Sequence, residues 1–336
     1  MIIDLLPRQD NTTSSADDAW ADFKLWHYTP SIAAAAIFVV LFSGLTGYHT
    51  FLIARRRTWF CIPFVIGGFF EIVGYIGRII SHNDMESTGP YIIQSLGLLL
   101  APILFAASIY MILGRMIRVI QGEQYSIIRV NWLTKIFVGG DIFCFMVQGA
   151  GGGLLSTADT KSQIDMYNNI ILGGLILQIL VFVLFITTAL MFQVRMHRRP
   201  TAAALDGPLG ERNGTVSGRL GRLTWKKLML GLYASSVLIT VRNLFRVIEY
   251  GTGSDGYLLT REWPLYLFDG LLMVLVLAIC IMWYNPEISK GNRKAAAAAA
   301  ARGYEVHSME SGDGMVQERG EVLPTKHQSN RVRPWS

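Results

Sequence analysis

Long runs of apolar residues alternate with short polar stretches along most of the chain. Runs of about 20 residues are long enough to cross a bilayer as helices. Such runs lie at 31–53, 59–80, 91–113, 132–155, 168–194, 227–248 and 264–284. They lack the alternation that marks strands, and a lipid-exposed chain must satisfy its backbone hydrogen bonds internally. The pattern therefore predicts an all-α integral membrane protein, a bundle of seven transmembrane helices.

Basic residues in the connecting loops gather on one side of this predicted bundle. That side holds Arg55, Arg56, Arg57, Arg115, Arg118, Arg129, eight Lys or Arg residues in 195–227 and eight more after 284. The other side holds Arg8, Lys24, Lys161 and Arg261. The positive-inside rule then predicts an N-terminus outside and a C-terminus in the cytoplasm. We expect an extracellular segment at 1–29, a membrane domain at 30–286 and a disordered cytoplasmic tail at 287–336.

Composition agrees with a membrane protein. Hydrophobic residues make up 51% of the 336 residues and charged residues 16%, and the mean hydropathy is +0.37. These values exclude an ordinary soluble or disordered chain. The net charge of +6 lies on alternate loops, so we expect no nucleic-acid surface. All three cysteines fall within the predicted spans, which argues against a disulfide framework.

Polar signals outside the spans lead to three smaller expectations. The loop at 195–225 is polar and charged, so we expect it to be largely disordered. Asn11 and Asn213 each begin a glycosylation sequon, and the predicted orientation places only Asn11 outside. The N-terminus lacks a basic segment followed by an apolar one, so we expect the first span to act as its own insertion signal.

Charged residues inside the spans carry the functional prediction. A charged group at the bilayer centre costs about 2.5 to 3.5 kcal/mol on insertion scales, so each requires a partner or a task. Glu71 and Asp141 fall near the middle of their spans, and Arg78 and Asp269 lie nearer the outer side. Arg242, Arg246 and Glu249 follow at i, i+4 and i+7, on one helix face. We therefore predict a polar site in the outer half, with Glu71 and Asp141 below it.

A structural explanation of the same charges stays open. Interhelical ion pairs could simply fix the packing. The set as a whole favours function, because the stripe on the sixth span carries more positive charge than its own acid balances. Gly149 and Gly153 form a small-xxx-small pair that predicts close helix packing, with local unwinding beside a substrate as the alternative.

Several classes of protein lack their signature residues. The last span contains no lysine for a retinal Schiff base, and the six histidines show no metal-ligand spacing. No glycine is followed by the Lys-Ser/Thr of a phosphate loop, and no Gly-x-Ser-x-Gly elbow occurs. We therefore expect no enzyme, no catalytic residues, no metal and no cofactor.

Specific strings add a family resemblance. They are Glu71-Ile-Val-Gly-Tyr-Ile-Gly-Arg78, Tyr91-Ile-Ile-Gln94, Ala101-Pro102 continuing to Ala107-Ser-Ile-Tyr110, Gln148-Gly-Ala-Gly-Gly-Gly153, Arg242-Asn-Leu-Phe-Arg246-Val-Ile-Glu249-Tyr250, and Glu262, Tyr266 and Asp269. With them the chain resembles the fungal lipid-translocating exporter family of RTA-like seven-transmembrane proteins, over about residues 26–286. One departure is Asn285-Pro286, where the family often has His-Pro.

The resemblance implies a fungal origin and a role in moving or sensing amphipathic lipids. The family includes proteins linked to sphingoid long-chain base export and to aminocholesterol resistance. It thus implies lipid homeostasis and drug resistance, in the plasma membrane or an endomembrane. It supplies no binding residues, so the candidate site rests on the charge argument.

The leading hypothesis is an exporter or translocase of amphipathic lipids, sphingoid long-chain bases or sterol-like toxic compounds. In this hypothesis Glu71, Asp141 and Asp269 pair with the lipid amine. Hydroxyls are bound by Gln94, Gln148 and Tyr110. Arg78, Arg242 and Arg246 hold those carboxylates ionised, or meet a phosphate if the substrate carries one. Glu249 completes the charged stripe on the sixth span. A desolvated Glu71 or Asp141 is also a candidate for proton exchange.

Two alternatives remain at this stage. One is a receptor-like lipid sensor that recruits cytoplasmic partners through its basic loop and tail. Deletion of most of 295–336 separates the two, because a carrier keeps moving lipid and a sensor loses its output. The other is a structural membrane protein, which would tolerate replacement of the whole charged set.

Overall fold

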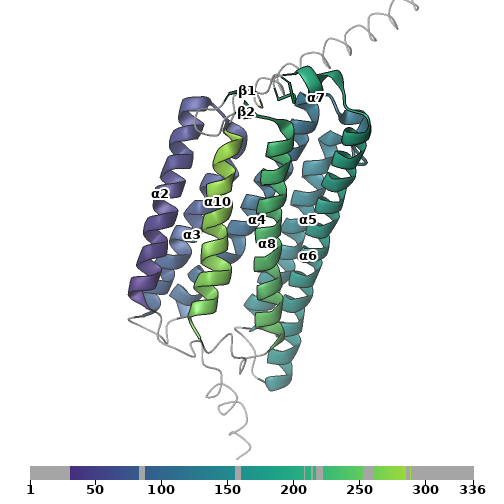
Figure 1. Ribbon diagram of the computed structural model, residues 1–336. Helices are drawn as coiled ribbons and strands as arrows, with labels where there is room; N and C mark the ends of the chain where they lie inside the picture. The colour runs from purple at the N-terminus through teal and green to yellow at the C-terminus, as the bar shows by residue number, and fades with distance from the viewer. Residues whose placement is uncertain are drawn as a thin grey trace, which may run out of the picture. The chain divides into compact units, whose positions relative to one another are not determined.

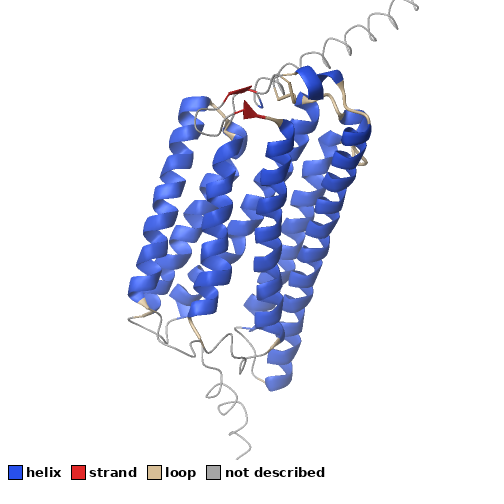
Figure 2. Cartoon of the chain, viewed as in Figure 1, coloured by secondary structure: helices blue, strands red, loops and turns tan. Residues whose placement is uncertain are grey.

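Seven apolar helices form the body of the protein in a computed structural model (Figures 1 and 2). The structure describes residues 31–82, 88–155, 160–207, 209–212, 215–216, 222–252, 261–284 and 288. The spans are α2 (Ile32–Arg56), η1 with α3 (Trp59–Cys61, Ile62–Ser81), α4 (Thr88–Val119), α5 (Val130–Leu155), α6 (Lys161–Arg198), α8 (Trp225–Gly251), and η4, α10 and η5 (Leu265–Leu271, Leu272–Cys280, Ile281–Trp283). This confirms the predicted seven-helix fold, while the sidedness of its ends stays a prediction.

Local sequence signals set the helix ends. The Ser31 hydroxyl accepts a hydrogen bond from the Ala34 amide at the start of α2, as an N-cap does. Arg57 ends that helix in the left-handed conformation, with φ of 53°. Thr160 and Gln163 form a reciprocal capping box at the start of α6. Each cap supplies a partner for backbone groups that the helix leaves open.

Helix α6 is longer than its apolar run predicts. It has 38 residues, or about 57 Å at 1.5 Å per residue, whereas a bilayer core is about 30 Å thick. The apolar run covers 168–194, and the capping box begins the helix seven residues earlier. Hydropathy locates the part of a helix that lies in lipid, and capping locates its actual end.

The described part of the loop between α6 and α8 is folded, so our expectation of disorder is wrong there. It contains α7 (Ala202–Asp206) and a two-stranded antiparallel ladder, β1 (Thr215–Val216) with β2 (Arg222–Leu223). The Thr201 hydroxyl donates to the Ile120 carbonyl at 2.5 Å, and Leu209 is fully buried. The Thr201 bond fastens the loop to the end of α4, and the Leu209 carbonyl accepts a hydrogen bond from the Trp225 amide at the start of α8. Asn213 and the tail after 288 lie outside the described residues.

Helix α4 lies at the centre of the bundle and is the most buried of the spans. It packs against α3 and α5, while α2 packs on α3, α6 on α5, and α8 on both α6 and α10. Glycines permit the closest approach between α3 and α4. A Cβ at Gly97 would lie 2.9 Å from the Phe70 carbonyl oxygen. Substitution there would push the two helices apart.

The close packing that we predicted for Gly149 and Gly153 is wrong. A Cβ on either residue would meet nothing within 4 Å. The α5–α6 interface instead uses Gly151, where a Cβ would lie 2.8 Å from Ile171 Cγ1. A motif spaced at i and i+4 identifies a face of a helix, and which face meets a neighbour depends on the whole bundle.

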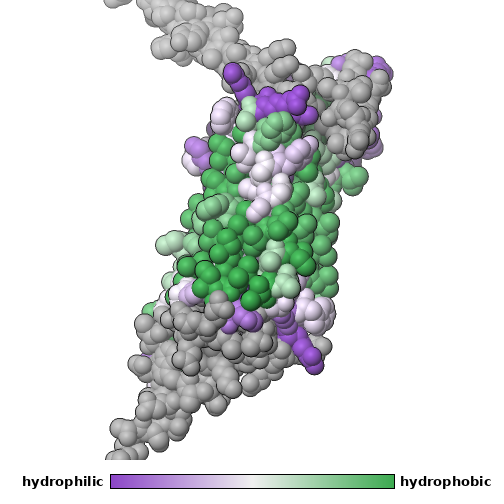
Figure 3. Space-filling model, turned by 90° about the vertical axis from the view of Figure 1, so that its left-hand side faces the viewer, coloured by the Kyte–Doolittle hydropathy of each residue, from purple (hydrophilic) through white to green (hydrophobic). Residues whose placement is uncertain are grey.

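An apolar belt surrounds the bundle. Large hydrophobic side chains such as Val40, Phe143, Leu180 and Leu230 are more than half exposed. Figure 3 shows a broad hydrophobic band across the middle of one face, with hydrophilic residues above and below it. Soluble proteins do not expose patches of this extent. The belt is a lipid-facing surface, and the chain is an integral membrane protein.

Candidate functional site

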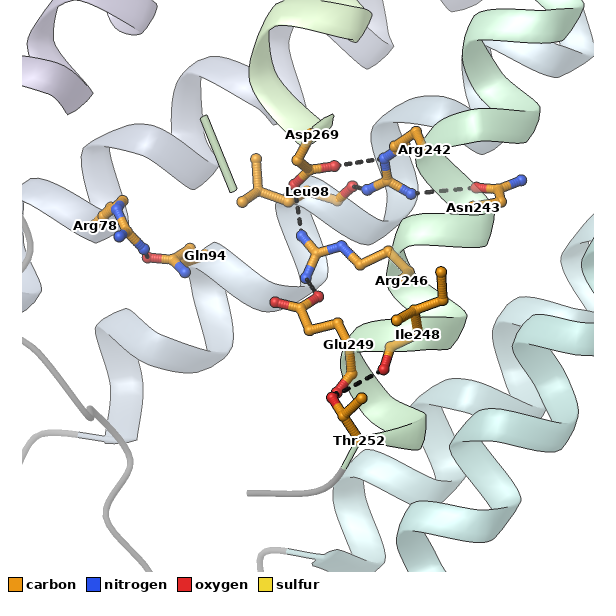
Figure 4. Close-up of polar contacts among 10 residues, drawn as sticks. All are labelled: Arg78, Gln94, Leu98, Arg242, Asn243, Arg246, Ile248, Glu249, Thr252 and Asp269. Atoms are coloured by element: carbon orange, nitrogen blue, oxygen red, sulfur yellow. Dashed lines mark hydrogen bonds and ion pairs between the residues drawn. The ribbon is translucent and has the colours of Figure 1, made fainter. Parts of the chain in front are cut away.

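A buried network of four charged side chains joins α8 to the π-helix η4 (Figure 4). Asp269 accepts hydrogen bonds from the Arg242 Nε and from an Arg246 guanidinium nitrogen, each at 2.5 Å. Arg246 also donates to Glu249 at 2.9 Å. Arg242 and Asp269 are 1% exposed, so these pairs are almost fully desolvated. Two guanidinium groups thus face two carboxylates, and the network is neutral as a whole.

A proline on the central helix helps to hold this network. Pro102 lies inside α4 and has no N–H to donate to the carbonyl four residues earlier, which is that of Leu98. The Leu98 carbonyl instead accepts a hydrogen bond from the Arg242 guanidinium (Figure 4). Membrane helices tolerate proline when a neighbour satisfies the freed carbonyl in this way. Pro102 therefore creates the acceptor that connects α4 to α8.

Asp269 lies in a widened helical turn. Residues Leu265–Leu271 form the π-helix η4, which continues directly into α10. Such turns are rare and often mark functional sites. Gly270 follows Asp269, and a Cβ there would lie 2.6 Å from Phe38 Cε1 and still closer to the Tyr75 hydroxyl. The wide turn and the glycine bring the seventh span against α2 and α3 beside the charged network.

Glu71 on α3 is a buried carboxyl group without a partner. Its side chain is 1% exposed, and its Oε1 atom has no hydrogen-bond partner. Asp269, Arg242 and Arg246 lie close enough to act on it electrostatically, yet no ion pair joins it to any described residue. The two arginines of the neighbouring network are already balanced by Asp269 and Glu249. With Glu71 included, the buried acids outnumber the buried arginines there by one.

A second polar cluster surrounds Arg78, two turns along α3 from Glu71. The buried Arg78 guanidinium donates to Glu262 at 2.9 Å and to the Tyr266 hydroxyl at 3.0 Å. It also donates to the Gln94 side-chain oxygen at 3.5 Å. The Ser31 amide donates to the same Glu262 oxygen at 2.7 Å. This cluster ties the starts of the first and seventh spans to α3 and α4.

Stacked aromatic rings separate the two polar clusters. Phe38 stacks on Tyr75 with ring centroids 5.2 Å apart and on Tyr266 at 5.3 Å. Phe42, one turn along α2 from Phe38, also stacks on Tyr75, with ring centroids 5.7 Å apart. The Tyr75 hydroxyl is buried without a partner. Glu71, Tyr75 and Arg78 follow at i, i+4 and i+7, so α3 presents an acid, an unpaired hydroxyl and a base along one face.

Asp141 belongs to a third group, between α4, α5 and α6. Its Oδ2 accepts a hydrogen bond from the Tyr110 hydroxyl at 2.8 Å, and its Oδ1 is buried without a partner. The rings of Phe137, Phe182 and Phe185 surround Tyr110, with centroids 4.5 to 6.1 Å away. On the same side of the bundle, Gln148 of α5 donates to Gln178 of α6 at 2.9 Å.

The structure therefore divides the predicted site into separate groups. Arg242, Arg246 and Glu249 lie together on α8, as their spacing predicts, and they meet Asp269 of η4 beside Glu71. Arg78 and Gln94 form a different cluster, and Figure 4 shows both apart from the Asp269 network. Tyr110, Asp141 and Gln148 lie at the α4–α5 and α5–α6 interfaces. A single lipid site would have to extend over all of these groups, and that it does so stays a prediction.

The charged residues within the spans did not predict two of these contacts, those of Glu262 and of the Leu98 carbonyl. Glu262 precedes the apolar run, so it was not counted among the charges inside the spans. Its spacing of i, i+4 from Tyr266 is a signal that could have placed both residues on the face that meets Arg78. One feature of the sequence indicates the bond from Arg242 to the Leu98 carbonyl. It is the proline at position 102, which leaves that carbonyl without its helical donor. Among the described residues, no group of three or more His, Cys, Asp or Glu could hold a metal ion.

Comparison with known proteins gives a consistent relationship. The family model described as "RTA1 like protein" matches residues 64–292. Protein RTA1 of Saccharomyces cerevisiae is 35% identical over 77% of this chain and 84% of its own length. Protoporphyrin uptake protein 1 of the same yeast is 35% identical, over 76% of this chain and 90% of its own length.

A third relative carries a lipid in its name. The sphingoid long-chain base transporter RSB1 of Saccharomyces cerevisiae is 25% identical over 78% of this chain and 73% of its own length. No solved structure shows a significant match. The family model therefore covers most of the membrane part of the chain, from Glu71 to the Asp269 network, and begins after Ser31 and Phe38.

Proposed function

The chain belongs to the RTA1-like family, and on that premise we propose that it is a membrane transporter that exports amphipathic lipids. The substrate class that the site fits best is the sphingoid long-chain base. Such a lipid has a cationic amine and hydroxyl groups at one end of a long alkyl chain. The name of the relative RSB1 agrees with this class, as does the presence of a buried acid that lacks a cation.

The unpaired carboxyl group of Glu71 is the single observation that carries the proposal. A buried carboxylate without a cation is strongly unfavourable, so Glu71 must bind either a proton or a cation that comes from outside the bundle. The Arg242–Arg246–Asp269–Glu249 network beside it is already neutral. A lipid amine would supply the missing positive charge, and the alkyl chain would lie against apolar helix faces or lipid.

The remaining groups have separate roles in this proposal. The buried Tyr75 hydroxyl, one turn from Glu71 and without a partner, is placed to bind a hydroxyl of the substrate. Gln94 stays a candidate for the same task through its contact with Arg78. Tyr110 and Gln148 already bond to Asp141 and Gln178, so we no longer assign them to the lipid head group.

The predicted orientation gives the transport its direction. We propose an extracellular segment at 1–29, a membrane domain at 30–286 and a cytoplasmic tail at 287–336, in the plasma membrane. Positive loops on the cytoplasmic side support this arrangement. Export would then carry the lipid amine from the cytoplasmic leaflet past Glu71 to the outer leaflet.

Reconstitution in liposomes tests the proposal. Purified protein is inserted into liposomes, and movement of a fluorescently labelled sphingoid base between leaflets is followed with a membrane-impermeant quencher. We expect movement well above that in protein-free liposomes. Glu71→Gln should slow it about tenfold or more, since a hydrogen bond to a charged group contributes about 1.5–3 kcal/mol. Glu123→Gln, at an exposed loop position, is the matched control and should leave the rate unchanged.

Two results would contradict the proposal. Movement no faster than in protein-free liposomes would exclude a lipid transporter, and saturable binding in that case would favour the lipid sensor. Equal rates for the wild type and Glu71→Gln would remove Glu71 from the transport path.

A further inference from the structure

Asp141 lies in surroundings quite different from those of Glu71. It is 1% exposed and receives one hydrogen bond, from the Tyr110 hydroxyl of α4. The ring of Tyr110 stands 4.5 Å from that of Phe185 and 5.5 Å from that of Phe137. The carboxyl group therefore lies next to a packed aromatic cluster, and its Oδ1 has no hydrogen-bond partner among the described residues.

Among the residues that the structure describes, the groups that face Asp141 include no cation. The titratable ones are the Tyr110 hydroxyl from α4 and the Cys144 thiol on α5 itself, while α6 contributes the rings of Phe182 and Phe185 around Tyr110. No described Lys or Arg forms an ion pair with it. An isolated carboxylate is costly in such surroundings, and a bound proton removes that cost.

The same surroundings determine which ligand Asp141 can take. A hard metal cation requires several oxygen ligands, and no described group of three or more acidic, histidine or cysteine side chains lies here. A lipid amine is a poor fit, since tightly packed rings flank the hydroxyl that binds the acid. A proton needs one carboxyl oxygen and little space. The group is also near the middle of its span, where a carrier must alternate access between the two sides.

We propose that Asp141 binds and releases the proton that drives lipid export. This inference rests on the proposed transport function and assigns its energy source. In the predicted orientation, a proton from outside binds the Asp141 carboxylate and later leaves to the cytoplasm. One lipid cation moves outward for each proton that moves inward, so neither charge nor protons are lost in the cycle.

Helix α4 connects the proton site to the lipid site. Its Tyr110 hydroxyl bonds to Asp141, and its Leu98 carbonyl bonds to Arg242 in the network beside Glu71. Pro102 lies between these two contacts and interrupts the backbone hydrogen bonding of the helix. Loss of the proton from Asp141 changes the strength of the Tyr110 bond. A small bend of α4 at Pro102 would then move the Leu98 carbonyl and alter its bond with Arg242.

One-to-one exchange makes a quantitative prediction. Because the exchange is electroneutral, a gradient of one pH unit should hold the lipid at about a tenfold ratio between the two leaflets at equilibrium. The acidic side should be enriched. An ordinary sphingoid base would collect there without any protein, since its neutral amine crosses the bilayer and is trapped by protonation. The probe must therefore carry a permanent charge.

The experiment uses a fluorescent N,N,N-trimethylated sphingoid base in liposomes that contain the full-length protein. The lumen is one pH unit more acidic than the medium, and the membrane potential is held at zero. A membrane-impermeant quencher reports the fraction in the outer leaflet. We expect about tenfold enrichment of the probe in the inner leaflet. Asp141→Asn should let the probe equilibrate to a ratio near one, and Asp165→Asn, at an exposed position, should behave as the wild type.

Each other outcome points to a different failure. Tenfold enrichment by Asp141→Asn would overturn the role of Asp141. Movement by the wild type to a ratio near one would show a carrier without proton coupling, which overturns this inference and leaves lipid transport intact. If the wild type moves neither the probe nor the ordinary base faster than protein-free liposomes do, the transport function itself would be overturned.

A spectroscopic measurement keeps the inference testable if Asp141→Asn does not fold. Infrared spectroscopy of the wild type at neutral pH should show the C=O stretching band of a protonated carboxyl group. Tyr110→Phe removes the hydrogen bond from that group, so it should shift the band. A band that stays in place in Tyr110→Phe, or no such band in the wild type, would contradict a proton on Asp141.

Discussion

At the scale of the residue, Asp269 is the centre of the charged network. It accepts from two guanidinium groups at once, one from Arg242 and one from Arg246. The spacing of Arg242, Arg246 and Glu249 on one helix face was readable from the sequence. The sequence did not show that Asp269 would complete this stripe, because that depends on how two helices distant in sequence pack together. The sequence also placed Asp141 near the middle of its span but with the wrong neighbours, because its partner Tyr110 is neutral and carries no charge signal.

The two acids of the network should differ in their effect on stability. Asp269→Asn leaves two buried guanidinium groups without their shared carboxylate, and breaking a buried pair costs about 3–5 kcal/mol. Glu249→Gln removes one contact at the edge and keeps a polar side chain there, so about 1–3 kcal/mol is expected. Thermal unfolding in detergent should therefore rank Asp269→Asn as the less stable variant. An equal loss for both would contradict a central role for Asp269.

At the scale of the element, the seventh span departs from a regular helix where it meets the site. Hydropathy located this span to within a few residues, because the composition of the span determines whether it lies in lipid. The π-helix at Leu265–Leu271 left no hydropathy signal, since it changes the geometry of the backbone and leaves the apolar pattern intact. Pro102 and Gly270 mark the two irregular places, but proline and glycine also occur elsewhere in the spans.

Gly270 should be sensitive to the smallest side chain. In Gly270→Ala the new Cβ would meet Phe38 and the Tyr75 hydroxyl, and overpacking of this kind costs about 1–3 kcal/mol. Gly152→Ala is the matched control, because a Cβ at Gly152 meets nothing within 4 Å. Thermal unfolding in detergent should show a loss for the first variant and little change for the second. Unchanged stability of Gly270→Ala would mean that the seventh span can move away from α2 and α3.

At the scale of the whole molecule, two independent features of the sequence agree. An odd number of spans places the two termini on opposite sides of the membrane. The basic residues of the loops indicate that the C-terminus is on the cytoplasmic side. The structure confirms the seven spans and leaves the sidedness to experiment. The loop between α6 and α8 shows the limit of composition, because a polar, charged segment that looked disordered is fastened to the end of α4 through Thr201.

Glycosylation tests the sidedness. Asn11 and Asn213 both begin sequons and both lie outside the described residues. In a eukaryotic host, Asn11 should be glycosylated and Asn213 should not, because glycosylation occurs on the side that becomes extracellular. Treatment with an endoglycosidase should lower the apparent mass of the wild type and leave that of Asn11→Gln unchanged. A shift that is lost in Asn213→Gln instead would invert the predicted orientation.

The central claim is that Glu71 is the group that recognises the amine of a transported lipid. Its most direct test compares transport of a labelled sphingoid base with that of its N-acetylated analogue, which has the same chain and no positive charge. The wild type should prefer the cationic lipid by about tenfold or more, the value of a hydrogen bond to a charged group, and Glu71→Gln should lose that preference. Equal transport of the two lipids by the wild type, or an unchanged preference in Glu71→Gln, would contradict the claim.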